Sequence, residues 1–497
     1  MSPASRTARF FATVAPLAVL AVALFARLGL MFGKGGGWGY AVDYDEGVYF
    51  SAASLVWRGA LPYRDFVFVH PPGLLAWLLI PAGLGKLVLG PTHAFVLARW
   101  IAAFAGAASV SLVYRLAEKR GGLVAGLAAG LALALYPEAV VVDRGVFLEP
   151  VLNLCCLTLA FCVQRGTLGL APEKRWLTFA GLAAGAAVAV KLWAGLWLLA
   201  ALVTVLRAGG VRGVVRFCVW AAIAAAALML PAAAAAPQAF LEQTLTFHTL
   251  RPPDGIPARW DRLTQLFSWR HAGSDLLALV GLVAVLARPG LRRTSLFFAL
   301  VFLGTLAAFL ANTTYWEQYN AHLAPSSAVL AGIGAATLWG LVRARPMPLK
   351  LAGALALCAL SLFSIVGTRR TFGHTGALLE VREAVRASKA RVACAMEPAW
   401  LLAADQLPPR IGPAGQFVDT YAMGLLEAGR SGKKFDSAQA AFDDVASQEP
   451  YAEAVQHCDL LVMGERGRME LAAPLEDQVL KTWRRAGETQ PDVYLKR

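Results

Sequence analysis

Residues 294 to 311 read TSLFFALVFLGTLAAFLA, a run without a single charge that directly follows the basic pair Arg292 and Arg293. A run of this length can cross the hydrocarbon core of a bilayer as a helix. Over the whole chain, 58% of the 497 residues are hydrophobic and 16% are charged, whereas soluble domains average roughly 45–50% apolar and about 25% charged residues. The composition therefore excludes a soluble globular protein.

Further apolar stretches of similar length occur along the chain. Six are as clear as the first, at 11–33, 93–114, 146–164, 217–235, 321–342 and 349–367, and four are weaker, at 74–90, 121–136, 176–206 and 274–287. Basic clusters separate them, namely Arg6/Arg9, Arg115/Lys119/Arg120, Arg165/Lys174/Arg175, Arg207/Arg212/Arg216, Arg288/Arg292/Arg293 and Arg343/Arg345/Lys350. Because Lys and Arg are retained on the cytoplasmic side of short loops, the net charge of +14 reflects membrane topology and implies no nucleic-acid partner.

If all six clusters face the cytoplasm, an even number of spans must separate each cluster from the next. Stretch 74–90 contains Pro81 and Lys86, and we expect it to lie in the outer interface instead of crossing. Stretch 176–206 must cross twice, since a single helix of that length would span about 46 Å, and its turn falls near Val190 and Lys191. The sequence thus predicts an α-helical polytopic protein of the cytoplasmic membrane, with about eleven spans, the amino terminus inside and the carboxyl terminus outside.

The composition changes near residue 368. We expect a membrane domain at 1–367, with outer loops at 34–92 and 236–273, and a small extracytoplasmic α/β domain at 368–497. In this second domain a helix is predicted at 376–390, short buried strands are predicted for RVACAM (391–396) and CDLLVMG (458–464), and VYLKR (493–497) closes the chain. Cys394 and Cys458 belong to two of these strands. An oxidising compartment would permit a disulfide between them, and two separate buried thiols are the alternative.

Acidic residues gather in the first predicted outer loop, whose residues 41–73 read AVDYDEGVYFSAASLVWRGALPYRDFVFVHPPG. Asp45 and Glu46 are adjacent in this loop, and a second acidic pair, Asp143 and Glu149, opens a later span. Ionisable groups near or in the bilayer are costly and usually line a cavity or a pathway. Helix capping is the alternative, in which Asp45 would cap a helix that starts at Gly47.

Several motifs follow one another in this part of the chain: DEGVY (45–49), RGALPYRD (58–65), HPPG (70–73), Arg99, Asp143, Lys191 behind a Gly/Ala-rich half-span, and YWEQYNAHLAPSSAVLAG (315–332). Together they resemble the GT-C superfamily of integral-membrane glycosyltransferases, especially the branch of protein O-mannosyltransferases and lipid A aminoarabinose transferases. DEGVY matches the Asp-Glu-x-x-Tyr of that branch, whereas His70 departs from a Lys often found just before the Pro-Pro. The resemblance covers residues 10–340.

The resemblance implies transfer of a sugar, with inversion, from a polyprenyl-phosphate donor to a hydroxyl of a lipid, glycan or protein acceptor at the outer face. Asp45 is expected to be the general base that takes the acceptor proton, and repulsion from Glu46 would raise one pKa of the pair. Glu46 and Asp143 are expected to orient hydroxyl groups. Lys191 is expected to hold the phosphate, with a snorkelling lysine as the alternative. Further candidates for substrate contact are His70, Glu149, Arg251, Tyr319 and His322.

Other interpretations stay open at this point. A divalent metal bound by Asp45, Asp143, His70 or His322 is possible, although their spacing matches no fixed motif. A multi-span transporter or glycolipid flippase would be expected to show repeated halves and helices broken near the midplane, and no repeat is visible. The outer domain is expected to serve acceptor selection or stability instead of chemistry, with Glu397 and Asp419 as its acceptor contacts.

Overall fold

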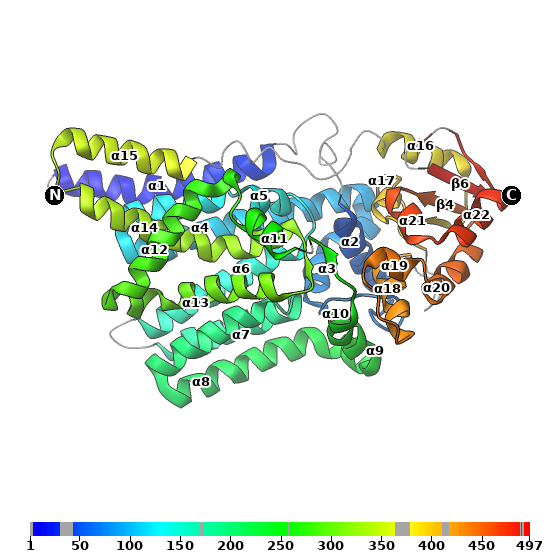
Figure 1. Cartoon of the computed structure of the whole chain (residues 1–497), viewed down its shortest axis with the longest axis horizontal. Helices are drawn as coiled ribbons and strands as arrows, with labels where there is room; N and C mark the ends of the chain where they lie inside the picture. Colours follow the sequence, from blue (N-terminus) through cyan, green and yellow to red (C-terminus); the bar gives the residue numbers. More distant parts are fainter. Residues whose placement is uncertain are drawn as a thin grey trace.

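A computed structural model describes residues 3–29, 43–168, 173–256, 258–362, 378–409, 417–487, 489 and 492–497. Figure 1 shows two parts along the long axis, a bundle of long helices and a smaller α/β domain that carries the end of the chain. The predicted boundary between residues 367 and 368 lies outside the described residues, as do residues 34–42 of the first outer loop.

The bundle is built from long apolar helices. They are α1 (Pro3–Leu28), α4 (Pro91–Ala134), the short α5 (Pro137–Asp143), α6 (Leu148–Thr167), α7 (Lys174–Val190), α8 (Ala194–Ala235), α12 (Ala272–Ala287), α13 (Pro289–Ala311), α14 (Asn320–Val342) and α15 (Met347–Leu362). Six helical segments among the described residues are long and apolar enough to cross a membrane, and further apolar helices are shorter. The chain is therefore a multi-pass membrane protein, and the number of eleven spans stays a prediction.

Two of the longest helices contain sharp turns. Helix α4 leaves helical geometry at Gly121 and Gly122, and α8 does so at Gly210, where φ is +60°. Glycine adopts a positive φ at no steric cost. The two halves of α4 then lie side by side, because a Cβ atom placed on Gly126 would be 3.0 Å from the ring of Tyr114. Stretch 176–206 is also divided, since α7 ends at Val190 and α8 begins at Ala194, so the predicted turn near Lys191 is confirmed.

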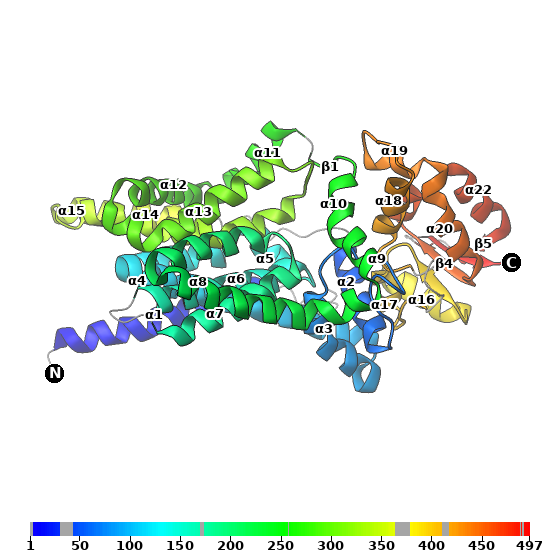
Figure 2. The same cartoon turned by 90° about the horizontal axis from the view of Figure 1, so that it is seen from below.

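Shorter segments lie between the bundle and the α/β domain (Figure 2). They are α2 (Tyr44–Trp57), α3 (Gly73–Leu84) with its π-helical continuation η3 (Gly85–Leu89), α9 (Pro237–Leu241), η4 (Glu242–Thr246), α10 (Phe247–Leu250), α11 (Arg259–Leu266), η5 (Trp269–His271), η6 (Glu317–Tyr319) and the parallel pair β1 (Asp254–Gly255) and β2 (Thr314–Tyr315). On α3 and η3 the side chains of Ile80, Leu87 and Val88 are 69–79% exposed. Exposed apolar residues of this kind are typical of a helix in the membrane interface.

The α/β domain has one four-stranded sheet in the order β3-β4-β6-β5. Strands β3 (Ala393–Ala395) and β4 (Leu460–Met463) are parallel, and β6 (Asp492–Lys496) runs antiparallel to β4 and to β5 (Trp483–Arg485). Its helices are α16 (Leu378–Ser388), α17 (Ala399–Ala403), α18 (Thr420–Arg430), α19 (Ala438–Phe442), α20 (Val445–Gln456), α21 (Glu465–Glu470) and α22 (Ala473–Thr482). The two predicted strands are present as β3 and β4, and most of the closing VYLKR lies in β6.

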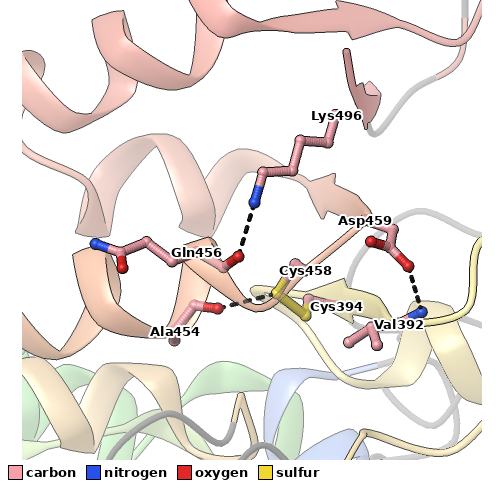
Figure 3. The surroundings of a disulfide bond; sticks show 7 residues. All are labelled: Val392, Cys394, Ala454, Gln456, Cys458, Asp459 and Lys496. Carbon is pink, nitrogen blue, oxygen red and sulfur yellow. Dashed lines mark hydrogen bonds between the residues drawn. A yellow bond between two sulfur atoms is a disulfide. The ribbon is translucent and has the colours of Figure 1, made fainter.

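A disulfide joins Cys394 and Cys458, whose Cα atoms are 6.0 Å apart (Figure 3). The parallel pairing of β3 with β4 brings the two cysteines together, because Cys394 lies in β3 and Cys458 directly precedes β4. A hydrogen bond lies next to the disulfide, where the backbone N–H of Val392 donates to the carboxylate of Asp459 at 3.0 Å. Of the two alternatives left open by the sequence, the structure has the disulfide.

Candidate active site between the bundle and the α/β domain

A cavity of about 590 Å³ lies where the bundle, the intervening segments and the α/β domain meet. The bundle side contributes the beginning of α6, the junction of α7 and α8, and the end of α13. The α/β domain contributes residues of α18 and α21. The predicted residues that line this cavity are Asp45, His70, Glu149, Lys191, Arg251 and Tyr319. Glu46, Asp143 and His322 are not part of its lining.

Helix α2 starts at the edge of the cavity and presents Asp45 to it. The cap of this helix is Asp43, whose side chain accepts a hydrogen bond from the backbone N–H of Asp45 at 3.0 Å. Glu46 accepts one from the backbone N–H of Asp43 at 3.2 Å, which completes a capping box. The alternative in which Asp45 caps the helix is therefore wrong, because the cap lies two residues earlier, at Asp43. The carboxylate of Asp45 instead accepts a hydrogen bond from the side-chain amide of Gln318 at 3.4 Å.

Glu46 points away from the cavity into the bundle. Both of its carboxylate oxygens accept from the guanidinium of Arg99 at 2.8 Å, and one also accepts from the backbone N–H of Val146 at 2.9 Å. Glu46 is 1% exposed and Arg99 is fully buried. A buried bidentate pair of this kind is strong and geometrically specific. The expectation that Glu46 orients a substrate hydroxyl is thus corrected, because the pair holds the beginning of α2 against α4.

The carboxylate closest in sequence that shares the cavity with Asp45 is Asp43 and not Glu46. Burial, and next the negative charge of Asp45, raise the pKa of Asp43 from 3.8 to about 7. Burial also raises the pKa of Asp45, and the carboxylate of Glu149 adds to this effect while the guanidinium of Arg466 opposes it. Desolvation and like charges disfavour the ionised form of a carboxyl group. A base with a raised pKa takes up a proton more readily near neutral pH.

The α/β domain docks directly onto the DEGVY motif. A Cβ atom on Gly47 would lie 2.5 Å from the backbone nitrogen of Ala399 in α17, so only glycine permits this approach. Tyr44 fixes the same contact, because its hydroxyl donates to Asp419 at 3.1 Å and accepts from the backbone N–H of Tyr421 at 2.9 Å. The first turn of α2 and the start of α18 therefore form one rigid wall of the cavity.

Lys191 lies on the side of the cavity that the bundle forms, in the three-residue break between α7 and α8. Its ammonium group donates to Glu149 at 2.6 Å and lies 4.5 Å from the ring centre of Tyr319. Lys191 is 6% exposed and Glu149 is 3% exposed. The lysine thus lies in the cavity and does not extend to solvent, contrary to the snorkelling alternative, and its charge is already paired.

His70 forms part of the wall and stacks on His248 with a ring-centre distance of 5.8 Å. Burial lowers the pKa of His70, and it lowers the pKa of His248 to about 4. Both rings are therefore neutral at neutral pH. The PYRD and HPPG motifs hold this wall together, since the hydroxyl of Tyr63 donates to the backbone carbonyl of His70 at 2.7 Å. His70 offers the cavity a neutral hydrogen-bonding ring and not a cation.

Arg251 follows α10 and reaches the cavity beside the α/β domain. It forms an ion pair with Asp254, which also accepts from the hydroxyl of Tyr421 in α18. The guanidinium carbon lies 5.5 Å from the ring centre of Tyr421. The Nε atom of Arg251 is buried and has no hydrogen-bond partner within the described part of the chain.

The sequence analysis missed Arg466, which α21 contributes to the cavity. Its guanidinium carbon lies 4.0 Å from the ring centre of Tyr44 and 5.0 Å from that of Tyr421. Glu470 is its nearest carboxylate at 4.0 Å, and burial raises the pKa of Glu470 to about 8. Arg466, Tyr421 and Asp419 of the α/β domain line the same cavity as Asp45, whereas Glu397 does not. The expected role of this domain in acceptor selection or stability stays a prediction.

Asp143 and His322 are buried elsewhere in the bundle. Asp143 pairs with Arg27 of α1 at 2.8 Å, and Nδ1 of His322 lies 2.8 Å from the amide oxygen of Asn153. These contacts correct the expectation that the two residues touch a substrate. The four residues considered as metal ligands, Asp45, Asp143, His70 and His322, do not come together. Among the described residues, no group of three or more His, Cys, Asp or Glu side chains is arranged to hold a metal ion.

The sequence matches no protein-family model and no curated protein, but the fold has relatives among solved structures. The structure of ArnT from Cupriavidus metallidurans bound to undecaprenyl phosphate aligns with a TM-score of 0.63 at 13% identity, over 99% of this chain and 98% of that chain. The Archaeoglobus fulgidus oligosaccharyltransferase tethered with an acceptor peptide aligns with a TM-score of 0.56 at 12% identity, over 98% and 75%.

A further relative is the archaeal oligosaccharyltransferase AglB from Archaeoglobus fulgidus, in complex with an inhibitory peptide and a dolichol-phosphate. It aligns with a TM-score of 0.53 at 13% identity, over 74% of this chain and 58% of that chain. The alignment with ArnT covers both the bundle and the α/β domain. The chain therefore has the fold of ArnT and of these archaeal oligosaccharyltransferases.

Proposed function

We propose that this chain is a glycosyltransferase that moves a sugar from a polyprenyl-phosphate donor to a hydroxyl acceptor. The observation that carries the proposal is the cavity itself, in which the carboxylate of Asp45 shares one space with Lys191, Arg251 and Arg466. Structures of the same fold hold undecaprenyl phosphate or a dolichol-phosphate, which supports a lipid-linked donor. A donor of this type must be met at the membrane surface, where the bundle ends and the cavity lies.

In the proposed reaction Asp45 takes the proton of the acceptor hydroxyl. The acceptor oxygen then forms a bond to the anomeric carbon of the sugar from the side opposite the phosphate. The bond between that carbon and the phosphate oxygen breaks, and polyprenyl phosphate leaves with the electron pair, so the anomeric configuration inverts. The leaving phosphate gains negative charge, which Lys191, Arg251 and Arg466 would stabilise as preorganised cations.

We further propose that the cavity and the α/β domain face the outside of the cytoplasmic membrane. The disulfide between Cys394 and Cys458 supports this orientation, because disulfides persist in oxidising compartments. Ser431, exposed at the end of α18, provides the test. A Ser431→Cys variant should react with an impermeant thiol reagent in intact cells, whereas Arg212→Cys, in the basic loop of α8, should react only after lysis. The reverse pattern would overturn the orientation.

The activity is tested by incubating the purified protein in nanodiscs with a lipid extract that contains polyprenyl-phosphate sugars. Mass spectrometry should detect free polyprenyl phosphate, together with a glycosylated acceptor when a membrane extract supplies one. The lipid or glycan that accumulates in a deletion strain then identifies the substrates. A flippase, the alternative function, would move the donor across vesicle membranes and leave it intact. Translocation without cleavage would therefore replace the present proposal.

A further inference from the structure

A second cavity, of about 490 Å³, lies at the opposite end of the bundle. Helices α6 and α13 line both cavities with opposite ends. Glu149 of α6 lines the first cavity and Gln164 the second, and Ala308 of α13 lines the first and Phe297 the second. The second cavity therefore lies far from Asp45. The comparisons and the proposed reaction assign it no role.

The polar lining of this second cavity is positively charged. It includes four arginines, Arg120, Arg207, Arg292 and Arg293, and no carboxylate among the described lining residues. The two acids nearest in sequence are engaged elsewhere, since Glu118 pairs with Arg115 at 3.0 Å and Glu173 pairs with Arg175 at 2.7 Å. Within the described ranges, no carboxylate oxygen lies within 4.0 Å of the four lining guanidinium groups.

Arg120 is held in place by neutral groups only. Its Nε and Nη2 atoms donate to the backbone carbonyl of Thr294 at 3.2 and 2.9 Å, and Nη1 donates to the side chain of Gln164 at 2.8 Å. The guanidinium also lies over the ring of Phe298, 4.8 Å from its centre. These contacts fix the position of the charge without neutralising it. Arg207, Arg292 and Arg293 are exposed around it.

The remaining wall of the cavity is uncharged. Gln164, Thr167, Thr204 and Thr294 contribute polar groups to it, and an apolar strip is formed by Val163, Leu168, Val203, Leu296, Phe297 and Phe298. One fixed and three exposed cations beside an apolar strip, between membrane-spanning helices, match a molecule with a phosphate head and a hydrocarbon chain. Basic pockets between such helices on the cytoplasmic side bind anionic lipid headgroups.

We propose that the second cavity binds an anionic phospholipid, with its phosphate among the four arginines and one acyl chain along the apolar strip. The guanidinium groups of all four arginines would donate charge-assisted hydrogen bonds to the phosphate. The occupant would then bridge α4, α6, α8 and α13. This inference does not depend on the proposed sugar transfer, because it rests on the opposite end of the molecule.

The test measures lipid binding to the full-length protein in a neutral detergent. Thermal unfolding and native mass spectrometry are recorded with added cardiolipin, with phosphatidylcholine and with inorganic phosphate. The test variant combines Arg207→Gln, Arg292→Gln and Arg293→Gln. The control variant combines Arg165→Gln, Arg212→Gln and Arg216→Gln, which removes the same charge from exposed arginines of the same end that do not line the cavity.

Cardiolipin should raise the unfolding temperature of the wild type and of the control, and phosphatidylcholine should not. The test variant should bind cardiolipin about tenfold more weakly or worse, because each basic residue at the membrane surface adds to the attraction for anionic lipid. Equal losses in both variants would reduce the effect to general surface charge and overturn the proposal. Stabilisation of the wild type by inorganic phosphate alone, to the same extent, would identify a free anion and not a lipid as the ligand.

Discussion

The two cavities lie at opposite ends of the bundle and differ in the charged residues that line them. The cavity beside the α/β domain is lined by three cations, Lys191, Arg251 and Arg466, and by four carboxylates, Asp43, Asp45, Glu149 and Asp419. The cavity at the other end is lined by four arginines and by no acid among its described residues. Two charged cavities in one bundle thus differ in whether their charges are compensated.

The difference teaches what each arrangement is suited to do. An uncompensated group of cations attracts any anion of suitable size, because its charges are unpaired before the ligand binds. Paired charges keep ionised groups inside a buried space at lower cost, because an unpaired buried charge is strongly destabilising. A ligand in the paired cavity must therefore exchange partners with the groups already present, as the proposed reaction requires when a proton is taken up and a phosphate leaves. The following variants break or sharpen this comparison.

The largest effect is expected for Asp45→Asn, which removes the proton acceptor and preserves the shape of the side chain. Loss of a general base typically costs about 10²–10⁴ in rate. Turnover of the lipid donor by the purified variant is the measurement, and Asp261→Asn, on the exposed face of α11, is the matched control with normal turnover. Near-normal turnover of Asp45→Asn would remove Asp45 as the base.

Arg466→Ala should lower kcat/KM for the donor by about 10–100-fold, since hydrogen bonds to charged groups contribute about 1.5–3 kcal/mol. Arg466→Lys should recover part of this loss by restoring the charge. The control is Arg468→Ala in the same helix, whose side chain pairs with Asp492 and Glu476 outside the cavity. If Arg466→Ala and Arg468→Ala had the same small effect, the α/β domain would act only as a cover.

Lys191→Ala should weaken donor binding in nanodiscs by about tenfold, and Lys191→Arg should weaken it less, because a phosphate at this depth requires a positive charge. Removal of the lysine also leaves Glu149 buried without its partner, which lowers stability. The double variant Lys191→Met with Glu149→Gln separates the two effects. It should unfold at nearly the wild-type temperature and still bind the donor weakly. Wild-type affinity in both variants would exclude Lys191 from phosphate binding.

The smallest effect concerns pH. Burial raises the pKa of Asp45. On the acid side of the pH profile, kcat/KM should therefore rise as pH increases through this pKa, because the base loses its proton. This rise is the acid limb of the profile. Asp43→Asn removes a neighbouring negative charge, which should move this acid limb to lower pH by less than about one unit. Asn caps a helix as well as Asp does, so α2 should stay folded. A limb that moves to higher pH would show that Asp43 does not act on Asp45 through its charge.

Much of the bundle could be predicted because membrane spans follow from composition alone. The turn at Lys191 was found since a 31-residue apolar stretch is too long for one crossing. The start of α2 was missed although its signal was present, since Asp43 and Glu46 have the three-residue spacing of a capping box. The opposite directions of Asp45 and Glu46 depend on Arg99, which lies 53 residues further along the chain than Glu46. Nothing in the DEGVY motif specifies that partner.

The contribution of the α/β domain to the cavity could not be found from the sequence. Arg466 belongs to a short helix with three other charged residues, and one of them, Arg468, points to a different partner. The side of α21 that meets Tyr44 is decided by the docking of α17 on Gly47, a contact between distant parts of the chain. Such long-range placement leaves no periodic signal in a single sequence.

The contact between Tyr44 and Asp419 joins residues that are 375 positions apart. At a synthesis rate of about 5–20 residues per second, Asp419 leaves the ribosome about 20–75 s after Tyr44. During this interval the bundle can insert into the membrane while the wall of the cavity that carries Tyr421 and Arg466 does not yet exist. A nascent or truncated chain thus has Asp45 but not the complete cavity, so the proposed activity should begin only once the α/β domain has folded.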